Sequence, residues 1–284
     1  MGKVYLNAQI MDASDARIPV SDGGFLYGAG LFETLRVQRG RVFGLTDHMD
    51  RLFASAAKLG FDLPLDRDGL AAAVQSVLQA NELAEARVRV TVSAGSMAAE
   101  STRPVPTVLV TATGLTAYPD EYYAKGVMAI LSPYRQNPAD PLAGHKATSY
   151  FSRMLGLQFA HERQAAESLG FTTDGYLAEG CVSNVFLVKD EVLLTPPLGT
   201  PVLPGVARLT VKRIAEARGL ALEERALVVD DLLGADEVFL TNVIMKVLPV
   251  IAIEKHTVAD GRVGPLTGQI RTWFDEEIER QCTA

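Results

Sequence analysis

Residues 86–95, ARVRVTVSAG, alternate strictly between apolar and polar side chains. This period of two places Val88, Val90 and Val92 on one face of a β-strand and the polar side chains on the other. A second strand, PTVLVTAT, follows at residues 106–113. The two segments together predict a sheet that buries one of its faces.

Helical patterns are mixed with strand patterns in both halves of the chain, so the predicted fold class is α+β. Apolar residues recur at helical spacing in residues 46–60, and Gly60 ends that helix. Residues 113–126 have little periodicity and contain glycine and proline, which indicates a linker. We therefore predict two domains, a smaller one over 1–118 and a larger one over 119–284. Further helices are predicted in 150–167 and 207–220, and further strands in 126–135, in 236–244 and in a hairpin over 184–196 that turns at Lys189 and Asp190.

Composition and charge exclude several classes of protein. The chain has 284 residues, 48% of them hydrophobic, and a formal net charge of −7. It has no Lys/Arg-rich run that could neutralise a phosphate backbone, so nucleic acid is not an expected partner. The first residues lack the order of a signal peptide, and no apolar run reaches membrane-spanning length. With only Cys181 and Cys282, no disulfide framework is expected, and we predict a cytoplasmic protein without a membrane partner.

Lys146 lies in the sequence GHKATSY, just ahead of a helical apolar pattern, and two other segments carry groups that could act with it. In LPGVARLT, residues 203–210, a Pro-Gly turn opens a helix whose first backbone N–H groups favour an anion; a plain turn is the alternative. In YLAEGCVSNVFLV, Glu179 precedes a strand-like run; an exposed loop acid is the alternative. The four histidines have no metal-ligand spacing, so no metal site is predicted.

An amine, a carboxylate and an anion cup are together what pyridoxal 5′-phosphate requires. The amine forms the Schiff base, the carboxylate keeps the pyridine nitrogen protonated so that the ring withdraws electrons, and the cup holds the phosphate. Lys146, Glu179 and the turn at 203–210 supply one candidate for each role. The sequence therefore predicts this cofactor.

Six segments, spread over nearly the whole chain, form a recognisable set. They are SDGGFLYGAGLFETLRV, LTDHMDRLFASAAKLG, SPYRQNPADPLAGHKATSY, AEGCVSNVFLV, LPGVARLTV and DEVFLTNVIMKVLPV. In this order they resemble the class IV aminotransferases, the fold-type IV pyridoxal-phosphate enzymes that include branched-chain aminotransferases, D-amino acid aminotransferases and 4-amino-4-deoxychorismate lyases. The resemblance implies a smaller N-terminal α/β domain, a larger C-terminal domain with a β-rich core flanked by helices, and a homodimer whose interface builds the sites.

The resemblance also implies roles for three residues at the cofactor ring. Lys146 is the Schiff-base lysine and the base that moves the substrate proton. Glu179 faces the pyridine nitrogen. Tyr150 matches the tyrosine that hydrogen-bonds the phenolic oxygen of the cofactor.

The resemblance also implies that one side chain and the start of a helix bind the phosphate of the cofactor. Arg51, in HMDRLFASA, matches the arginine that binds the phosphate, and its alternative reading is a surface helix arginine. Val206 and Ala207 match residues that bind phosphate through backbone N–H groups. Many relatives carry a threonine at the position of Ala207 and a hydroxyl residue at that of Val243, so here the backbone and Arg51 hold the phosphate.

The subgroup is predicted from differences between motifs. Tyr27 and Phe32 are expected to line the substrate side. Branched-chain enzymes typically read FEGIR where this chain has FETLR, and the Arg-x-His carboxylate trap of D-amino acid enzymes has no match in VSAGSMAAESTRP. Thr34 falls at the position of a lyase threonine that assists proton transfer, with selection for β-propensity as the alternative. Arg103 and Arg135 are further candidates to bind a substrate carboxylate.

We therefore predict an aminodeoxychorismate lyase, which converts 4-amino-4-deoxychorismate to 4-aminobenzoate and pyruvate. The alternative is a class IV aminotransferase that acts on branched-chain L-amino acids, D-amino acids or amines with a keto-acid acceptor. A third reading, a cofactor-binding protein without catalysis, is disfavoured by the intact Lys146 and Glu179.

Overall fold

The computed structural model describes residues 2–97 and 105–283 and divides the chain into two compact units. The first unit comprises residues 1–116, 145–150 and 278–284, and the second comprises residues 117–144 and 151–277. None of the described helices is long and apolar enough to cross a membrane.

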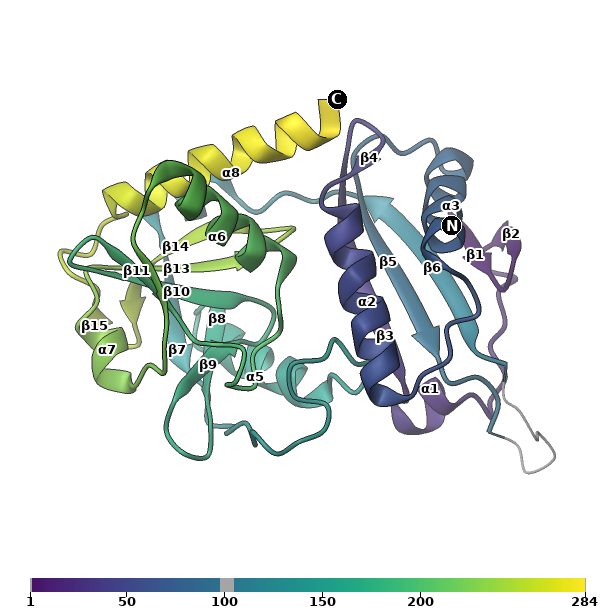
Figure 1. Cartoon of the computed structure of the whole chain (residues 1–284), viewed down its shortest axis with the longest axis horizontal. Coiled ribbons are helices and arrows are strands. Elements are labelled where there is room, and N and C mark those ends of the chain that lie inside the picture. Colours follow the sequence, from purple (N-terminus) through teal and green to yellow (C-terminus); the bar gives the residue numbers. More distant parts are fainter. Residues whose placement is uncertain (1, 98–104, 284) are drawn as a thin grey trace. The chain divides into compact units, whose positions relative to one another are not determined.

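The first unit is a six-stranded antiparallel sheet with the strand order β2-β1-β6-β5-β3-β4 (Figure 1). Helices α2 and α3 pack against it and share one apolar core with β3, β5 and β6. The elements are β1 (Lys3–Leu6), β2 (Gln9–Asp12), α1 (Gly23–Tyr27), β3 (Gly30–Gln38), β4 (Arg41–Val42), α2 (Leu45–Leu59), α3 (Arg67–Ala80), β5 (Ala86–Ser93) and β6 (Thr107–Gly114).

The alternation predicted for residues 86–95 is confirmed in β5. Val88, Val90 and Val92 have no exposed surface, because they face α2 and α3 in the core. The predicted helix of residues 46–60 is α2, and it ends where Gly60 adopts a left-handed conformation with φ of 66°. The polar face of β5 is left on the other side of the sheet.

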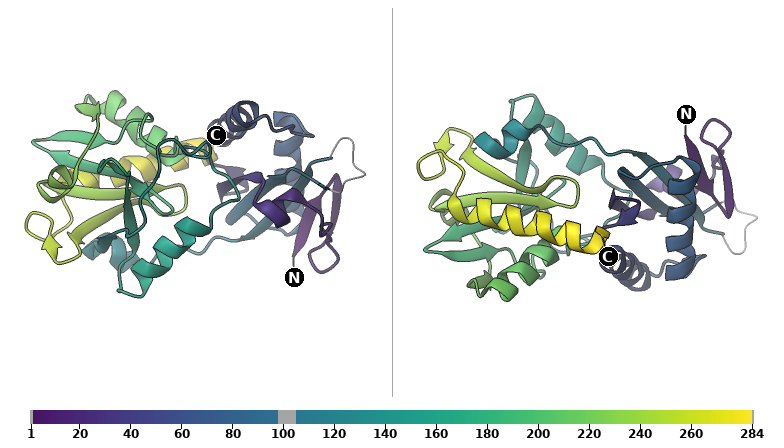
Figure 2. Two further views of the ribbon diagram at one scale, coloured as in Figure 1. Left: turned by 90° about the horizontal axis from the view of Figure 1, so that it is seen from below. Right: turned by 90° about the horizontal axis from the view of Figure 1, so that it is seen from above.

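The second unit is a nine-stranded mixed sheet with the order β12-β11-β10-β13-β14-β7-β8-β9, and β15 pairs with β14. Figure 2 shows α6 alongside α8, and Arg218 of α6 contacts both Trp273 and Glu276 of α8. The elements are α4 (Asp120–Lys125), β7 (Val127–Leu131), α5 (Phe151–His161), β8 (Glu167–Phe171), β9 (Leu177–Gly180), β10 (Asn184–Lys189), β11 (Val192–Thr195), α6 (Val206–Arg218), β12 (Leu222–Glu224), α7 (Val229–Leu233), β13 (Glu237–Asn242), β14 (Lys246–Ile253), β15 (His256–Thr257) and α8 (Pro265–Thr283). The last residues of α8, from Ile278 on, are assigned to the first unit.

Three local predictions differ from the structure. The segment expected to be a linker contains helix α4, which is anchored because buried Tyr123 donates its hydroxyl proton to the Met245 carbonyl. The helix expected over 150–167 ends at His161, and left-handed Gln164 then turns the chain into β8. The hairpin turns at Asp190 and Glu191, both with positive φ, one residue later than expected.

The division into units also differs from the expected boundary between residues 118 and 119. Residues 145–150 belong to the first unit because they run along the edge of β3. There the Phe32 N–H donates to the Lys146 carbonyl at 2.9 Å, and the Thr148 N–H donates to the Gly30 carbonyl at 2.8 Å. Backbone pairing of this kind could not be read from the spacing of side chains.

Candidate active site

Backbone pairing with β3 fixes the side chain of Lys146 on a defined face of the first sheet. Its neighbour Ala147 joins the core with α2 and α3. Because successive side chains of an extended segment alternate, Lys146 is directed to the opposite face. Its Nζ lies 4.6 Å from the centre of the Phe32 ring and 5.7 Å from that of Tyr150.

The rings of Phe32 and Tyr150 form an edge-to-face pair, with centres 5.3 Å apart and planes at 83°. Phe32 is 4% exposed. The structure therefore brings together three of the predicted site residues, and it holds the Lys146 ammonium against aromatic faces, where a cation is attracted by the ring quadrupole.

Arg89 is a functional candidate that the sequence analysis assigned only to the polar face of a strand. Its guanidinium carbon lies 3.8 Å from the centre of the Phe32 ring, and Nε donates to Thr91 Oγ1 at 3.2 Å. Burial, followed by the nearby charge of Arg87, lowers the pKa of Arg89. Thr34 is half-buried and pairs directly with Arg89 in the β3–β5 register, two residues beyond Phe32. The only indication of this role in the sequence was the presence of an arginine in a strand expected to bury one face.

Tyr27 is 70% exposed at the end of α1, so it is not packed into the aromatic group around Lys146.

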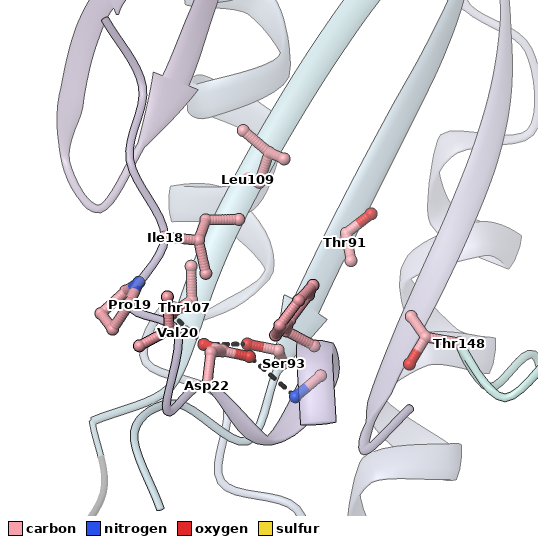
Figure 3. A pocket seen from close by; sticks show the side chains of 11 residues that line it. Ile18, Pro19, Val20, Asp22, Thr91, Ser93, Thr107, Leu109 and Thr148 are labelled. Atoms are coloured by element: carbon pink, nitrogen blue, oxygen red, sulfur yellow. Dashed lines mark hydrogen bonds between the residues drawn. The ribbon is translucent and has the colours of Figure 1, made fainter. Parts of the chain in front are cut away.

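Close to α1, a cavity of about 290 Å³ opens onto β5 and β6 (Figure 3). Asp22, 1% exposed, accepts hydrogen bonds from Ser93, Thr107 and the Gly24 N–H at 2.7–2.8 Å. These bonds fix the start of α1 on the sheet. The cavity is lined by Ile18, Pro19, Val20, Asp22, Gly24, Phe25, Thr91, Ser93, Thr107, Leu109 and Thr148.

Arg51 is buried rather than a surface helix residue, so that alternative reading is wrong. Its Nε and Nη2 donate to the two carboxylate oxygens of Glu33, and His48 Nδ1 lies 2.8 Å from Glu33 Oε2. Burial alone would raise the pKa of Glu33, but Arg51 and then His48 outweigh it and lower that pKa to about 2. Burial lowers the pKa of His48, which favours the neutral form of its imidazole. Neither Glu33 nor His48 was singled out in the sequence.

Glu179 lies in β9 of the second unit and is 2% exposed, so the exposed-loop reading is also wrong. Its Oε1 accepts from Arg153 Nη2 at 2.5 Å. Its Oε2 accepts from Asn184 Nδ2 and from the Leu203 N–H, both at 2.9 Å. Three donors from separate segments therefore orient this carboxylate.

A second buried carboxylate, Glu167 of β8, holds the loop that follows Glu179. It accepts from the N–H groups of Cys181 and Val182 and from Ser183 Oγ at 2.8–3.2 Å. Burial raises the pKa of Glu167 despite these donors. Burial, with the neighbouring Glu167 carboxylate, raises the pKa of the Cys181 thiol to about 12. Nothing in the sequence indicated this contact, because residue 167 was assigned to a helix.

Gly205 is the N-cap residue of helix α6, and among the described residues no side chain caps the start of this helix. A Cβ at Gly205 would lie 1.9 Å from Asn184 Oδ1, so only glycine fits beside this amide. Val206 and Ala207, 3% and 1% exposed, form the first turn, where backbone N–H groups and the helix dipole favour an anion. The same Asn184 also bonds Glu179, which connects the helix start to the carboxylate within the second unit.

The two additional arginine candidates do not contribute to this description. Arg103 lies outside the described residues. The Arg135 guanidinium lies over the ring of Phe171 at 5.6 Å. The predicted residues thus fall into two groups, with Lys146, Tyr150, Phe32, Thr34, Arg51 and Tyr27 in the first unit and Glu179, Val206 and Ala207 in the second.

Comparisons with known proteins agree over most of the chain. The family model described as amino-transferase class IV matches residues 30–253. The chain is 32% identical over 278 residues to a protein named putative branched-chain-amino-acid aminotransferase from Methanocaldococcus jannaschii, with 96% of each chain covered. It is 31% identical over 290 residues to D-alanine aminotransferase from Bacillus licheniformis, with 97% of each covered.

Solved structures of two aminotransferases and of one lyase are also similar to this chain over nearly its whole length. The branched-chain amino acid aminotransferase of Escherichia coli matches with a TM-score of 0.91 and 29% identity, over 97% of this chain and 94% of that one. A T.th. branched-chain amino acid aminotransferase, solved with pyridoxamine 5′-phosphate, matches with a TM-score of 0.91 and 26% identity, over 99% and 95%. The 4-amino-4-deoxychorismate lyase of Pseudomonas aeruginosa matches with a TM-score of 0.85 and 28% identity, over 96% and 98%.

Proposed function

This chain belongs to the class IV aminotransferase family, and we propose that it transfers an amino group from an amino acid to a keto acid. Enzymes of this family use pyridoxal 5′-phosphate, and the chain is a pyridoxal-phosphate-dependent enzyme. Two curated relatives that match nearly the whole chain are named as a branched-chain and a D-alanine aminotransferase, which supports amino-group transfer over the lyase reaction predicted from the sequence.

The residues present fit the cofactor. Lys146 supplies an amine held beside aromatic rings, and buried Glu179 supplies a carboxylate for the ring nitrogen. The start of α6, with no side-chain cap, offers the N–H groups of Val206 and Ala207 to the phosphate. In this proposal Arg51 adds a guanidinium to the phosphate and Tyr150 a hydroxyl to the phenolic oxygen.

The observation that carries the proposal is the pair of cations over one ring. Lys146 Nζ and the Arg89 guanidinium both lie on Phe32. When bound, the cofactor withdraws electrons from the carbon beside the substrate nitrogen. Lys146 would take the proton from that carbon and deliver it to the carbon on the other side of the same nitrogen, which is the proton movement that amino-group transfer requires. Arg89, a planar fork suited to carboxylates, binds the acid group of the amino acid or keto acid and orients that carbon.

We infer that a second copy of the chain covers the region around α1, in keeping with the homodimer that the resemblance implies. Val20, Phe25 and Tyr27 are 81%, 75% and 70% exposed, and Val20 and Phe25 line the cavity beside α1. Exposed apolar groups of this size favour association. Analytical ultracentrifugation should show a dimer that Phe25→Asp converts to monomer, and a wild-type monomer would contradict this part of the proposal.

The lyase remains a second candidate because of Thr34. Its side chain lies on the same strand face as Phe32 and opposite Arg89, close to where a proton would be moved. The similarity to the Pseudomonas aeruginosa lyase also supports it. A lyase needs no keto-acid acceptor, whereas a transaminase alternates between two forms of the cofactor, so the two candidates differ in what they consume.

The deciding experiment offers substrates singly to the purified holoenzyme. L-leucine, L-glutamate and D-alanine are each added without an acceptor, and the visible absorbance of the bound pyridoxal form is followed. We expect one of them to convert the enzyme rapidly to the pyridoxamine form. Repeated release of pyruvate and 4-aminobenzoate from 4-amino-4-deoxychorismate alone, with no conversion by the amino acids, would instead establish the lyase.

A matched pair of arginines tests the carboxylate partner. Arg89→Met should raise the KM for the amino acid by about tenfold or more, because a charge-assisted hydrogen bond is lost. Arg87→Met, an exposed neighbour on the same strand, should leave the KM unchanged. Equal effects of the two substitutions would remove Arg89 from the substrate site.

A further inference from the structure

Glu179 has a charged partner whose role the proposed function does not explain. Arg153 of α5 places Nη2 2.5 Å from Glu179 Oε1 and donates from Nη1 to the Gly180 carbonyl at 3.3 Å. The Arg153 side chain is 23% exposed and that of Glu179 is 2% exposed. At this burial an ion pair is only weakly screened by water. The carboxylate proposed for the ring nitrogen is therefore partly neutralised by the protein itself.

The hydrogen bonds of Glu179 leave it limited capacity to accept another donor. A carboxylate offers about four acceptor positions, two on each oxygen. Oε2 already accepts from Asn184 and from the Leu203 N–H, while Oε1 accepts from Arg153. The open position lies on Oε1. A ring nitrogen that donates to Glu179 would therefore share one oxygen with Arg153.

We propose that Arg153 is a positioning residue that holds Glu179 and lowers the proton affinity of the cofactor's ring nitrogen. The inference rests on the proposed function, in which Glu179 is the partner of that nitrogen. An arginine beside a carboxylate stabilises its ionised form, but a positive charge a few ångströms from a protonated pyridine opposes that proton. Arg153 thus keeps the Glu179 carboxylate oriented but reduces the stabilisation of the ring proton. The cofactor ring is then protonated less strongly and withdraws electrons less strongly.

Two other ionisable groups, Glu167 and Cys181, lie around the loop that follows Glu179. Their charge states must not change in a test of Arg153. Glu167 bonds the backbone of Cys181 and Val182, and the Cys181 thiol is influenced by Glu167, Arg153 and Glu179. Because the thiol pKa is about 12, Cys181 stays neutral in the working range of pH. Substitutions at Arg153 leave both groups in place, so a change at the ring nitrogen can be assigned to the arginine charge.

The test reads the ring nitrogen directly. The full-length enzyme is loaded with ¹⁵N-labelled pyridoxal 5′-phosphate, and the nitrogen resonance is recorded from about pH 6 to about pH 10, a range in which carboxylates are normally ionised. Four variants are compared with wild type: Arg153→Met, Arg153→Lys, Glu179→Gln and, as a control from the segment after α5, Arg163→Met. Arg163 is 51% exposed and stacks on Phe159. If Arg153→Met fails to fold, Arg153→Gln replaces it.

We expect Arg153→Met to move the resonance toward the protonated value and to raise the deprotonation midpoint by about one pH unit. Arg153→Lys, which keeps the charge, should restore most of the wild-type behaviour, and Arg163→Met should match wild type. Identical resonances for wild type and Arg153→Met over the whole range would overturn the inference. Glu179→Gln tests the premise separately: if it leaves the resonance unchanged, Glu179 is not the ring partner and the site assignment of the proposed function fails.

Discussion

Glu33 and Arg51 make a two-point contact in which Arg51 Nε lies 2.8 Å from Glu33 Oε1 and Nη2 lies 2.5 Å from Oε2. Their side chains are 1% and 7% exposed. Glu33 is the residue between Phe32 and Thr34, so β3 directs one face to Lys146 and Arg89 and the other to Arg51. A single strand thus orients the amine environment and the proposed phosphate-binding guanidinium.

Replacement of Glu33 by Gln should leave Arg51 buried without its counter-charge. Loss of one partner of a buried ion pair costs about 3 kcal/mol or more in the free energy of unfolding. Urea unfolding followed by circular dichroism measures this change. Glu121→Gln, which removes the exposed partner of Lys125, should leave the urea midpoint unchanged. Equal midpoints for wild type and Glu33→Gln would show that the pair is not stabilising.

Stability should decline on acidification in two ranges of pH. The pKa of His48 is lowered from 6.5 by burial, so the unfolded chain takes up a proton first and stability falls as the pH drops below about 6.5. The pKa of Glu33 is lowered from 4.5 to about 2, so its contribution is complete above pH 4.5 and is lost as the pH falls toward 2.

His48→Gln should reduce the first decline, to which half-buried His145 also contributes because burial lowers its pKa, and should keep the second. Urea midpoints measured at intervals from neutral pH to about pH 3, where Glu33 is still mostly ionised in the folded state, resolve the two ranges. Exposed His256 provides the control, because His256→Gln should reproduce the wild-type profile. A wild-type midpoint that stays constant between pH 7 and about pH 5.5 would contradict the role of His48.

Lys146→Ala should fold and lose covalent attachment of the cofactor. Borohydride reduction of the wild-type holoenzyme, followed by peptide mapping, should place the label on Lys146. Two of the other lysines, Lys246 and Lys125, are engaged in ion pairs with Asp275 and Glu121, both at 2.6 Å. Label on either of these lysines would overturn the assignment.

Gly205→Ala should weaken cofactor binding through Asn184. The new Cβ would displace Asn184 Oδ1, and with it the donor that Asn184 gives to Glu179. Overpacking of this kind costs about 1–3 kcal/mol in the free energy of unfolding. We expect the cofactor Kd to rise as well, because Asn184 no longer holds the Glu179 carboxylate. Gly199→Ala, which meets no atom within 4 Å, is the matched control. The clash needs both the new Cβ at position 205 and the Asn184 side chain. In an Asn184→Ala background, Gly205→Ala should therefore change the cofactor Kd very little. Additive effects of Asn184→Ala and Gly205→Ala on the Kd would contradict this account.

Glu167→Gln should loosen the loop between Glu179 and Asn184. An amide NH₂ would face the Val182 N–H or the Cys181 N–H, and one buried donor left without an acceptor costs about 1–3 kcal/mol. We expect lower thermal stability together with faster loss of cofactor on dialysis. Exposed Glu162→Gln should change neither. Normal cofactor retention in a destabilised Glu167→Gln protein would restrict Glu167 to a purely structural role.

Much of the fold was predictable because it depends on periodicity. The alternation in β5 and the helical spacing and glycine stop of α2 are properties of short segments, and each was confirmed. The end of α5 was not predictable, because the chain turns after it through Gln164 in a positive-φ conformation. The spacing of apolar residues does not indicate such a conformation. The return of residues 145–150 to the first unit depends on backbone pairing with β3, a contact between segments more than a hundred residues apart.

The candidate site divides in the same way. Lys146 and Glu179 could be proposed from residue type and motif. Arg89, Arg153 and Glu167 could not, because their roles depend on which groups they meet across the sheet or across a loop. Charged residues gain such roles from burial, and the burial of an individual arginine or glutamate is set by tertiary packing.

The enclosure of the Glu179 loop also decides how its thiol behaves toward oxidants. Cys181 is 7% exposed, and its Sγ lies 3.6 Å from the Ser168 carbonyl. With a pKa of about 12, only roughly one thiol in 10⁵ is ionised at neutral pH, and the thiolate is the form that peroxides and alkylating agents attack. Buried Cys282 has a raised pKa as well. The chain should therefore tolerate aerobic conditions without a reducing agent, since the contacts that orient the loop also keep its sulfur chemically inert.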